Sequence, residues 1–117
     1  MVHSMKLQPK YFDYMKNGEK TIEIRLLDEK RQQIKVGDEI EFIKEPERQE
    51  KLLTKVIELI IYPSFNELLD SNPIECFAGP DNSKKELLSI LEEFYTKEEQ
   101  EKYGVVGIRV EVLKLVL

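Results

Sequence analysis

Hydrophobic and polar residues alternate along several segments of the chain. The clearest alternation runs from Thr21 to Leu26, where isoleucine and leucine residues take turns with a threonine, a glutamate and an arginine. A period of two predicts a half-buried β-strand with its apolar side chains on one face and its polar side chains on the other. Similar patterns predict further strands over residues 2–7, 39–43, 52–62 and 105–115.

Helical signals occur near the N-terminus and again before the last strand. Pro9 favours the first turn of a helix and Asn17-Gly18 favours its end, so a short helix is expected between them. Capping patterns, in which a glutamate follows a serine or threonine by three residues, predict helix starts at Ser64, Ser83 and Thr96. The helix after Ser83 carries an apolar stripe that we expect in the core: Leu87, Leu88, Ile90, Leu91 and Phe94.

The order of these elements predicts an α+β fold. The connections between the strands over 21–26, 39–43 and 52–62 are too short for helical crossovers, so the sheet is expected to be antiparallel or mixed. The last strand must return to the sheet after the helical segment, which suggests a small curled β-barrel with helices packed at its sides. With 117 residues and no linker-like segment, one domain over 1–117 is expected.

Charge is distributed unevenly along the chain. The net charge of −5 argues against non-specific coating of nucleic acids. Residues 1–35 nevertheless hold eight Lys or Arg and five Asp or Glu, a net +3, whereas the remainder holds ten and eighteen, a net −8. The basic first third can therefore present a local anion-binding face.

Cysteine content and apolar segments bear on the compartment. The lone cysteine, Cys76, excludes an intrachain disulfide. The N-terminus has no apolar signal core, and the longest apolar stretch, 56–62, is too short to span a bilayer. We therefore expect a cytoplasmic protein that is not inserted in a membrane.

The segment Gly18–Arg25 concentrates the side chains that can carry chemistry. An arginine can hold a phosphate or carboxylate through two hydrogen bonds, and a lysine can offer a point charge to a phosphate or an oxyanion. A glutamate can accept hydrogen bonds from an exocyclic amine or act as a general base. The same pattern is also typical of a solvent-facing strand with ordinary cross-strand ion pairs. The candidates are Lys20 at the mouth of the strand and Thr21, Glu23 and Arg25 on one strand face.

This segment reads Gly-x-Lys-Thr-Ile-Glu-Ile-Arg, and it stands after an amphipathic helix and before the Val-Gly-Asp turn at 36–38. In this arrangement the sequence resembles the ASCH (activating signal cointegrator homology) domain, a family of the PUA-like superfamily of small β-barrels. Further similarities at Met5-Lys6-Leu7, at Lys35 and over 103–108 extend the resemblance to nearly the whole chain. It implies a PUA-like barrel for this protein.

The resemblance also implies a function. ASCH domains were proposed to bind RNA through a cleft beside this strand, so Lys20, Glu23 and Arg25 would line such a cleft here. The expected partner is RNA or a nucleotide-like small molecule. Another hypothesis is a protein-interaction module that uses the barrel as a scaffold.

Catalysis is the alternative that the resemblance raises. Some bacterial relatives are amidohydrolases that deacetylate N4-acetylcytidine by means of a lysine, a threonine and a glutamate. Lys20 matches the lysine, but Glu23 stands where these relatives keep the threonine, and Thr21 lies two residues earlier. Their glutamate comes from the helical region, where Glu75 and Asp81 are the candidates. A small hydrolase, either an amidohydrolase or a ribonuclease, would therefore use Lys20 and Glu23.

Neighbouring basic and aromatic residues can extend the site. Lys30 and Arg31 can form a basic rim that meets RNA phosphates, although the acidic residues beside them fit a solvated loop equally well. Tyr11 and Tyr14 can stack on a base, and helical spacing places at least one of them in the core. The chain has no Cys/His cluster and no Gly-rich phosphate loop, so neither a metal nor a cofactor is predicted.

Overall fold

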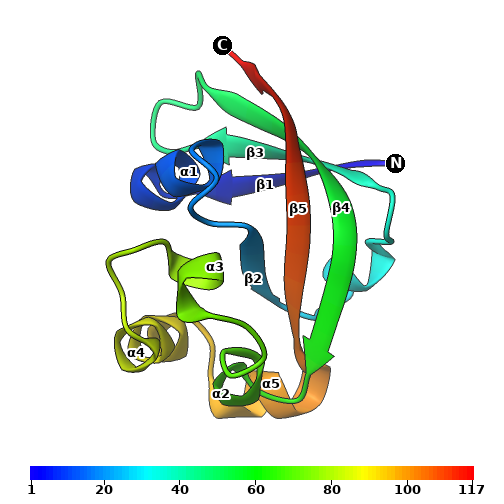
Figure 1. Ribbon diagram of the computed structural model, residues 1–117. Coiled ribbons are helices and arrows are strands. Elements are labelled where there is room, and N and C mark those ends of the chain that lie inside the picture. The colour runs from blue at the N-terminus through cyan, green and yellow to red at the C-terminus, as the bar shows by residue number, and fades with distance from the viewer.

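Five strands form one mixed β-sheet in the computed structural model, which describes residues 1–117. They are β1 (Val2–Leu7), β2 (Ile22–Leu26), β3 (Glu39–Lys44), β4 (Lys51–Tyr62) and β5 (Val105–Val116). Their order in the sheet is β1-β3-β4-β5-β2 (Figure 1). The β1–β3 pair is parallel and the other pairs are antiparallel. The predicted strands and the α+β class are confirmed, with boundaries that agree to within about one residue.

The sheet stays open, so the predicted closed barrel is not confirmed. β1 and β2 lie at its two edges, and no backbone hydrogen bond joins them. β2 is short and pairs only with the segment Val105–Arg109 of β5. The two edges are linked at one point, where the Arg25 guanidinium of β2 donates to the Lys6 carbonyl of β1. A side chain therefore bridges the gap that a backbone ladder would close in a barrel.

Helices cover the sheet in two groups (Figure 1). The first helix, α1 (Pro9–Lys16), has its proline in the first turn as predicted. The second group gathers at the opposite end of the molecule and comprises α2 (Phe65–Leu68), α3 (Ile74–Ala78), α4 (Lys84–Phe94) and α5 (Lys97–Tyr103). A single 3₁₀ turn, η1 (Arg31–Gln33), lies in the segment between β2 and β3.

Side-chain caps fix where three of these helices begin. Ser83 and Thr96 form complete capping boxes at the starts of α4 and α5. Ser64 accepts a hydrogen bond from the Glu67 backbone nitrogen at the start of α2. The predicted helix starts are thus confirmed. None of the helices is long and apolar enough to cross a membrane.

Two apolar cores lie on opposite faces of β5. Alternate residues of β5 from Val106 to Val110 pack with β1, α1, β3 and β4. Val105 packs instead with α2, α3, α4 and the apolar residues of β2. Gly107 lets Ile22 of β2 and Leu68 of α2 pack closely over β5, because a Cβ there would lie 3.1 Å from side-chain atoms of both residues. The polar residues of β2 therefore point to the other face of the sheet.

Candidate functional site

A pocket of about 670 Å³ opens where the two edge strands face each other. One wall comes from the end of β1 and the start of α1, including Lys6 and Tyr11. The other wall comes from α4 and includes Phe94. Polar residues of the Gly18–Arg25 segment lie between these walls: Lys20, Glu23 and Arg25. The pocket therefore occupies the gap that keeps the sheet from closing.

Lys20 is buried beside this pocket, with only 3% of its surface exposed. Its Nζ donates to the backbone oxygens of Ile22 and Phe77, both at 2.6 Å, and lies 3.1 Å from Glu23 Oε1. A lysine ammonium carries three hydrogens, and these three acceptors satisfy all of them. Burial lowers the pKa of Lys20, and the Glu23 carboxylate opposes that shift. Three acceptors around Nζ match the three N–H donors of a protonated lysine.

Glu23 lies between two cations. Its Oε1 faces Lys20, and its Oε2 accepts from Arg25 at 2.8 Å for Nε and 2.7 Å for Nη2. Burial opposes the negative charge and by itself would raise the pKa of Glu23. The charges of Arg25 and Lys20 outweigh burial, so the pKa of this carboxyl lies below its usual range. Glu23 is therefore held as a carboxylate.

Arg25 connects this cluster to β1 and to the pocket. Its Nη2 also donates to the Lys6 carbonyl at 2.8 Å. Its remaining nitrogen, Nη1, has no hydrogen-bond partner within the protein, and the side chain is 17% exposed. Arg25 and Glu23 share a face of the sheet because they stand opposite Val106 and Ile108 on β5. Of the three charged groups, Arg25 is the one with a donor left for a ligand.

We call Lys20, Glu23 and Arg25 the charged triad. Two cations and one anion give it a net positive charge in a buried setting, where electrostatic attraction is stronger than in water. Its fixed donors suit a phosphate, a carboxylate or a carbonyl oxygen. Its groups are poorly suited to take up protons, because the lysine is already fully donating and the glutamate has a lowered pKa.

Comparisons with known proteins show which family the chain belongs to. The model of the ASCH domain family matches residues 5–114. The chain belongs to the ASCH domain family. Such domains generally bind RNA. No curated protein matches this ASCH domain.

Two solved structures are similar to this ASCH domain over almost their whole length. The crystal structure of hypothetical protein PH0355 has 41% sequence identity and a TM-score of 0.84, and the match covers 97% of this chain and 100% of that chain. The solution NMR structure of protein PF0455 from Pyrococcus furiosus has 38% identity and a TM-score of 0.77, with 97% and 99% covered. The family resemblance expected from the sequence is confirmed.

Other residues predicted for the site lie outside the pocket of this ASCH domain. Thr21 precedes β2 and does not line the pocket, and its Oγ1 is buried without a hydrogen-bond partner. Lys30 is exposed and does not line the pocket. Arg31 pairs with Asp28 at 3.1 Å and also stays outside the pocket. The structure thus unites Lys20, Glu23 and Arg25 but separates them from Thr21, Lys30 and Arg31.

The helical acidic candidates and one tyrosine are also outside. Glu75 and Asp81 are exposed and do not line the pocket. Asp81 accepts a hydrogen bond from Tyr14, whose ring packs against Gly79. Tyr11 does line the pocket, and its ring centroid lies 5.9 Å from Lys20 Nζ. One tyrosine is therefore structural and the other remains available to a ligand.

Several pocket residues were not among the site residues predicted from the sequence, and Glu45 and Phe94 are two of them. Glu45 reaches the pocket because its backbone nitrogen donates to the Leu7 carbonyl, a contact created by the parallel β1–β3 pairing. Phe94 was expected in the core but is 71% exposed at the rim of the pocket, so that prediction was wrong. Its apolar spacing with Leu87 and Leu91 was the available signal, but periodicity does not say what faces the stripe.

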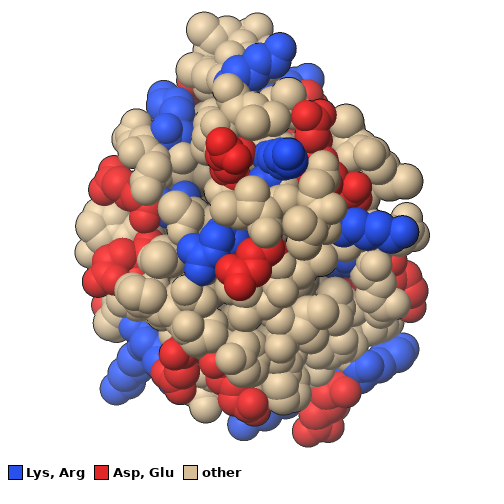
Figure 2. Space-filling view, turned by 45° about the vertical axis from the view of Figure 1, so that its right-hand side comes forward, with Lys and Arg blue, Asp and Glu red and all other residues tan.

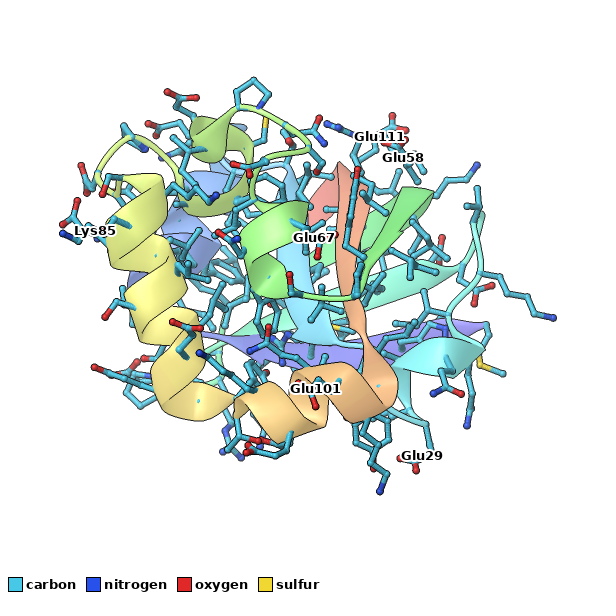
Figure 3. All side chains as sticks on the ribbon, turned by 90° about the horizontal axis from the view of Figure 1, so that it is seen from below. Glu29, Glu58, Glu67, Lys85, Glu101 and Glu111 are labelled. Atoms are coloured by element: carbon cyan, nitrogen blue, oxygen red, sulfur yellow. The ribbon has the colours of Figure 1, made fainter.

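The charges on one face of the molecule do not form a broad surface of one sign. In Figure 2, Lys and Arg are interspersed with Asp and Glu on a largely uncharged surface. Figure 3 shows Glu67 of α2 and Glu101 of α5 on the outside of the helical end, where both are exposed. The face seen in Figure 2 therefore offers no extended basic surface to a ligand.

Proposed function

We propose that this ASCH domain binds RNA, or a nucleotide-like ligand, in the pocket beside β2, with the charged triad as its polar floor. The observation that carries the proposal is the state of Arg25. Two of its nitrogens are fixed by Glu23 and Lys6, and the third, Nη1, is free beside the pocket. A guanidinium held in this way is already oriented for an incoming oxygen, so little entropy is lost when it binds.

The size and charge of the pocket support the same proposal. A volume of about 670 Å³ falls in the range of small-molecule sites and can hold a base with its sugar. Its charged lining residues are Lys6, Lys20 and Arg25 against Glu23 and Glu45, three cations and two anions, so the pocket carries one net positive charge. A single phosphate group complements that charge.

Hydrolysis remains the second candidate, because Lys20 Nζ and Glu23 Oε1 lie 3.1 Å apart beside the pocket. In such a reaction, Lys20 would stabilise an oxyanion and Glu23 would activate water. The lowered pKa of Glu23 makes it a weak base, which favours binding over catalysis. Incubation with N4-acetylcytidine and with single-stranded RNA, followed by chromatography of the products, tests this candidate. Release of cytidine or cleaved RNA that is lost in Glu23→Gln, under conditions where circular dichroism shows the variant to be folded, would establish it.

Binding is tested by the fluorescence anisotropy of a labelled single-stranded RNA. Arg25→Lys keeps a positive charge next to Glu23 but removes the planar fork, so RNA affinity should fall about tenfold. Arg31→Lys is the matched control, because Arg31 is ion-paired but lies outside the pocket, and its affinity should not change. The affinity of the unmodified protein should also fall as salt is added. Equal affinities for both variants, or no RNA binding at all, would refute the proposal.

A further inference from the structure

The apolar stripe of α4 consists of buried and half-buried residues but ends on an exposed aromatic ring. Leu87 and Leu91 are only 4% and 8% exposed, whereas Phe94 is 71% exposed. Seven residues separate Phe94 from Leu87, which places both on nearly the same side of the helix. All three side chains line the pocket, but of the three only Phe94 is left exposed by the elements around it.

The backbone that presents Phe94 is held firmly. Tyr95, the next residue, ends α4 with a hydrogen bond from its backbone nitrogen to the Leu91 carbonyl at 2.9 Å. Its ring packs against Phe65 in the second core, with 5.4 Å between the ring centroids. Tyr95 thus anchors the end of the helix while Phe94 projects to the rim. The exposed ring sits on an ordered helix end and not on a loose terminus.

Other residues of the same pocket are positively charged. Lys6 provides positive charge at the β1 wall, and Arg25, between the two walls, has a free Nη1. An exposed aromatic face and a free guanidinium in one pocket match the two parts of a nucleotide, a flat base and a phosphate. A purely apolar ligand would leave the guanidinium without a partner, and a bare phosphate would leave Phe94 uncovered.

We infer that Phe94 is a base-stacking residue and that the pocket takes an unpaired base of single-stranded RNA in preference to duplex RNA. This inference rests on the proposed function. In a duplex, neighbouring base pairs cover both faces of each base, so Phe94 can reach a base face only when the strand is open. Arg25, through its free Nη1, and Lys6 then hold the adjoining phosphate. The inference names the substrate class and assigns a ligand contact to α4.

The absence of tryptophan from the chain makes a direct test possible. Phe94→Trp introduces a single tryptophan at the rim of the pocket. Stacking of a base on this indole should quench its emission when single-stranded RNA is added, and the same RNA annealed to its complement should not quench it at equal concentration. Ile61→Trp is the matched control, because Ile61 is 59% exposed on β4 and does not line the pocket. Its emission should stay unchanged with either RNA.

Phe94→Ala supplies the second measurement. Because the ring is largely exposed, its removal should leave the thermal unfolding midpoint unchanged but weaken single-strand binding about tenfold. Wild-type RNA binding together with unquenched Phe94→Trp emission and an unaffected Phe94→Ala would overturn the stacking role while leaving the proposed function intact. Equal quenching by duplex would overturn the preference for an unpaired base. Failure of the wild-type protein to bind RNA would overturn both proposals.

Discussion

Two ion pairs in the first third of the chain have the same sequence separation and the same length but different surroundings. Lys20 and Glu23 are three residues apart with 3.1 Å between Nζ and Oε1. Asp28 and Arg31 are also three residues apart with 3.1 Å between Oδ2 and Nη1. The side chains of the first pair are 3% and 8% exposed, whereas those of the second pair are 27% and 18% exposed.

Burial, and not spacing, therefore separates the two pairs. The outer pair, Asp28–Arg31, lies in a loop where both side chains keep some contact with solvent, and such ion pairs contribute little to stability. The inner pair, Lys20–Glu23, belongs to the charged triad, in which each charge depends on its neighbours because water cannot replace them. A basic and an acidic residue three positions apart can thus form either a surface ion pair or a buried pair beside a pocket.

The largest expected effect comes from neutralising the centre of the triad. Glu23→Gln leaves Lys20 and Arg25 as two buried positive charges without a counter-ion. The free energy of unfolding should fall by about 3 kcal/mol or more, as measured by urea denaturation followed by circular dichroism. The matched change in the outer pair, Asp28→Asn, should lower it by less than about 1 kcal/mol. Similar losses for the two variants would contradict the distinction between the pairs.

Low pH should reduce the difference in unfolding free energy between the wild-type protein and Glu23→Gln. The pKa of Glu23 is lowered in the folded protein, so the unfolded state binds more protons at acid pH and the stability from this carboxylate is lost as the pH falls. The window begins near the ordinary glutamate value of about 4.3 and extends below it. The stability gap between wild type and Glu23→Gln should therefore shrink from pH 6 to pH 3 in denaturation curves. A gap that is constant or widens would mean that Glu23 is not a stabilising carboxylate.

A smaller effect of opposite sign is expected at the entrance to β2. The Thr21 hydroxyl oxygen is buried without a hydrogen-bond partner. Thr21→Val replaces it by a methyl group of similar shape, so the free energy of unfolding should rise by about 0.5–1 kcal/mol. RNA affinity should stay the same because Thr21 does not line the pocket. Destabilisation, or weaker RNA binding, would show that the hydroxyl has a role that its position does not suggest.

The smallest effect is expected for the exposed lysines of the outer loop. Lys30 and Lys35 are exposed, and neither lines the pocket. Alanine at either position should change single-strand affinity by about twofold or less at moderate salt, because long-range attraction between exposed charges is screened. Anisotropy titrations beside Arg25→Lys measure the contrast. A loss as large as that of Arg25→Lys would place the RNA on the loop instead of the pocket.

Local patterns in the sequence were enough for the elements and for part of the site. The alternating pattern predicted β2 and the burial of Ile22, Ile24 and Leu26 correctly. The serine and threonine capping patterns predicted the starts of α4 and α5. These predictions succeeded because they depend on neighbours within a few residues. Alternation also placed Glu23 and Arg25 on one face, and Lys20, predicted at the mouth of the strand, reaches Glu23 through its long side chain.

Long-range packing decided the rest. Thr21 was assigned to the same face as Glu23, but the strand begins one residue later and its hydroxyl is enclosed away from the pocket. Phe94 has the spacing of a core residue, yet it is exposed where it lines the pocket. The pocket lies in the gap between β1 and β2, which exists because β2 pairs only with the first residues of β5 and leaves the sheet open.

The sequence by itself thus determined which residues form strands and helices, and that a lysine, a glutamate and an arginine cluster near β2. Only the tertiary structure decided that this cluster is buried, that it borders a pocket and that an exposed aromatic ring, Phe94, lines the same pocket. The physical reason is that charge and periodicity are local properties of a chain, whereas burial depends on which distant segments meet. Lys20–Glu23 and Asp28–Arg31 are alike in spacing and differ in burial for that reason.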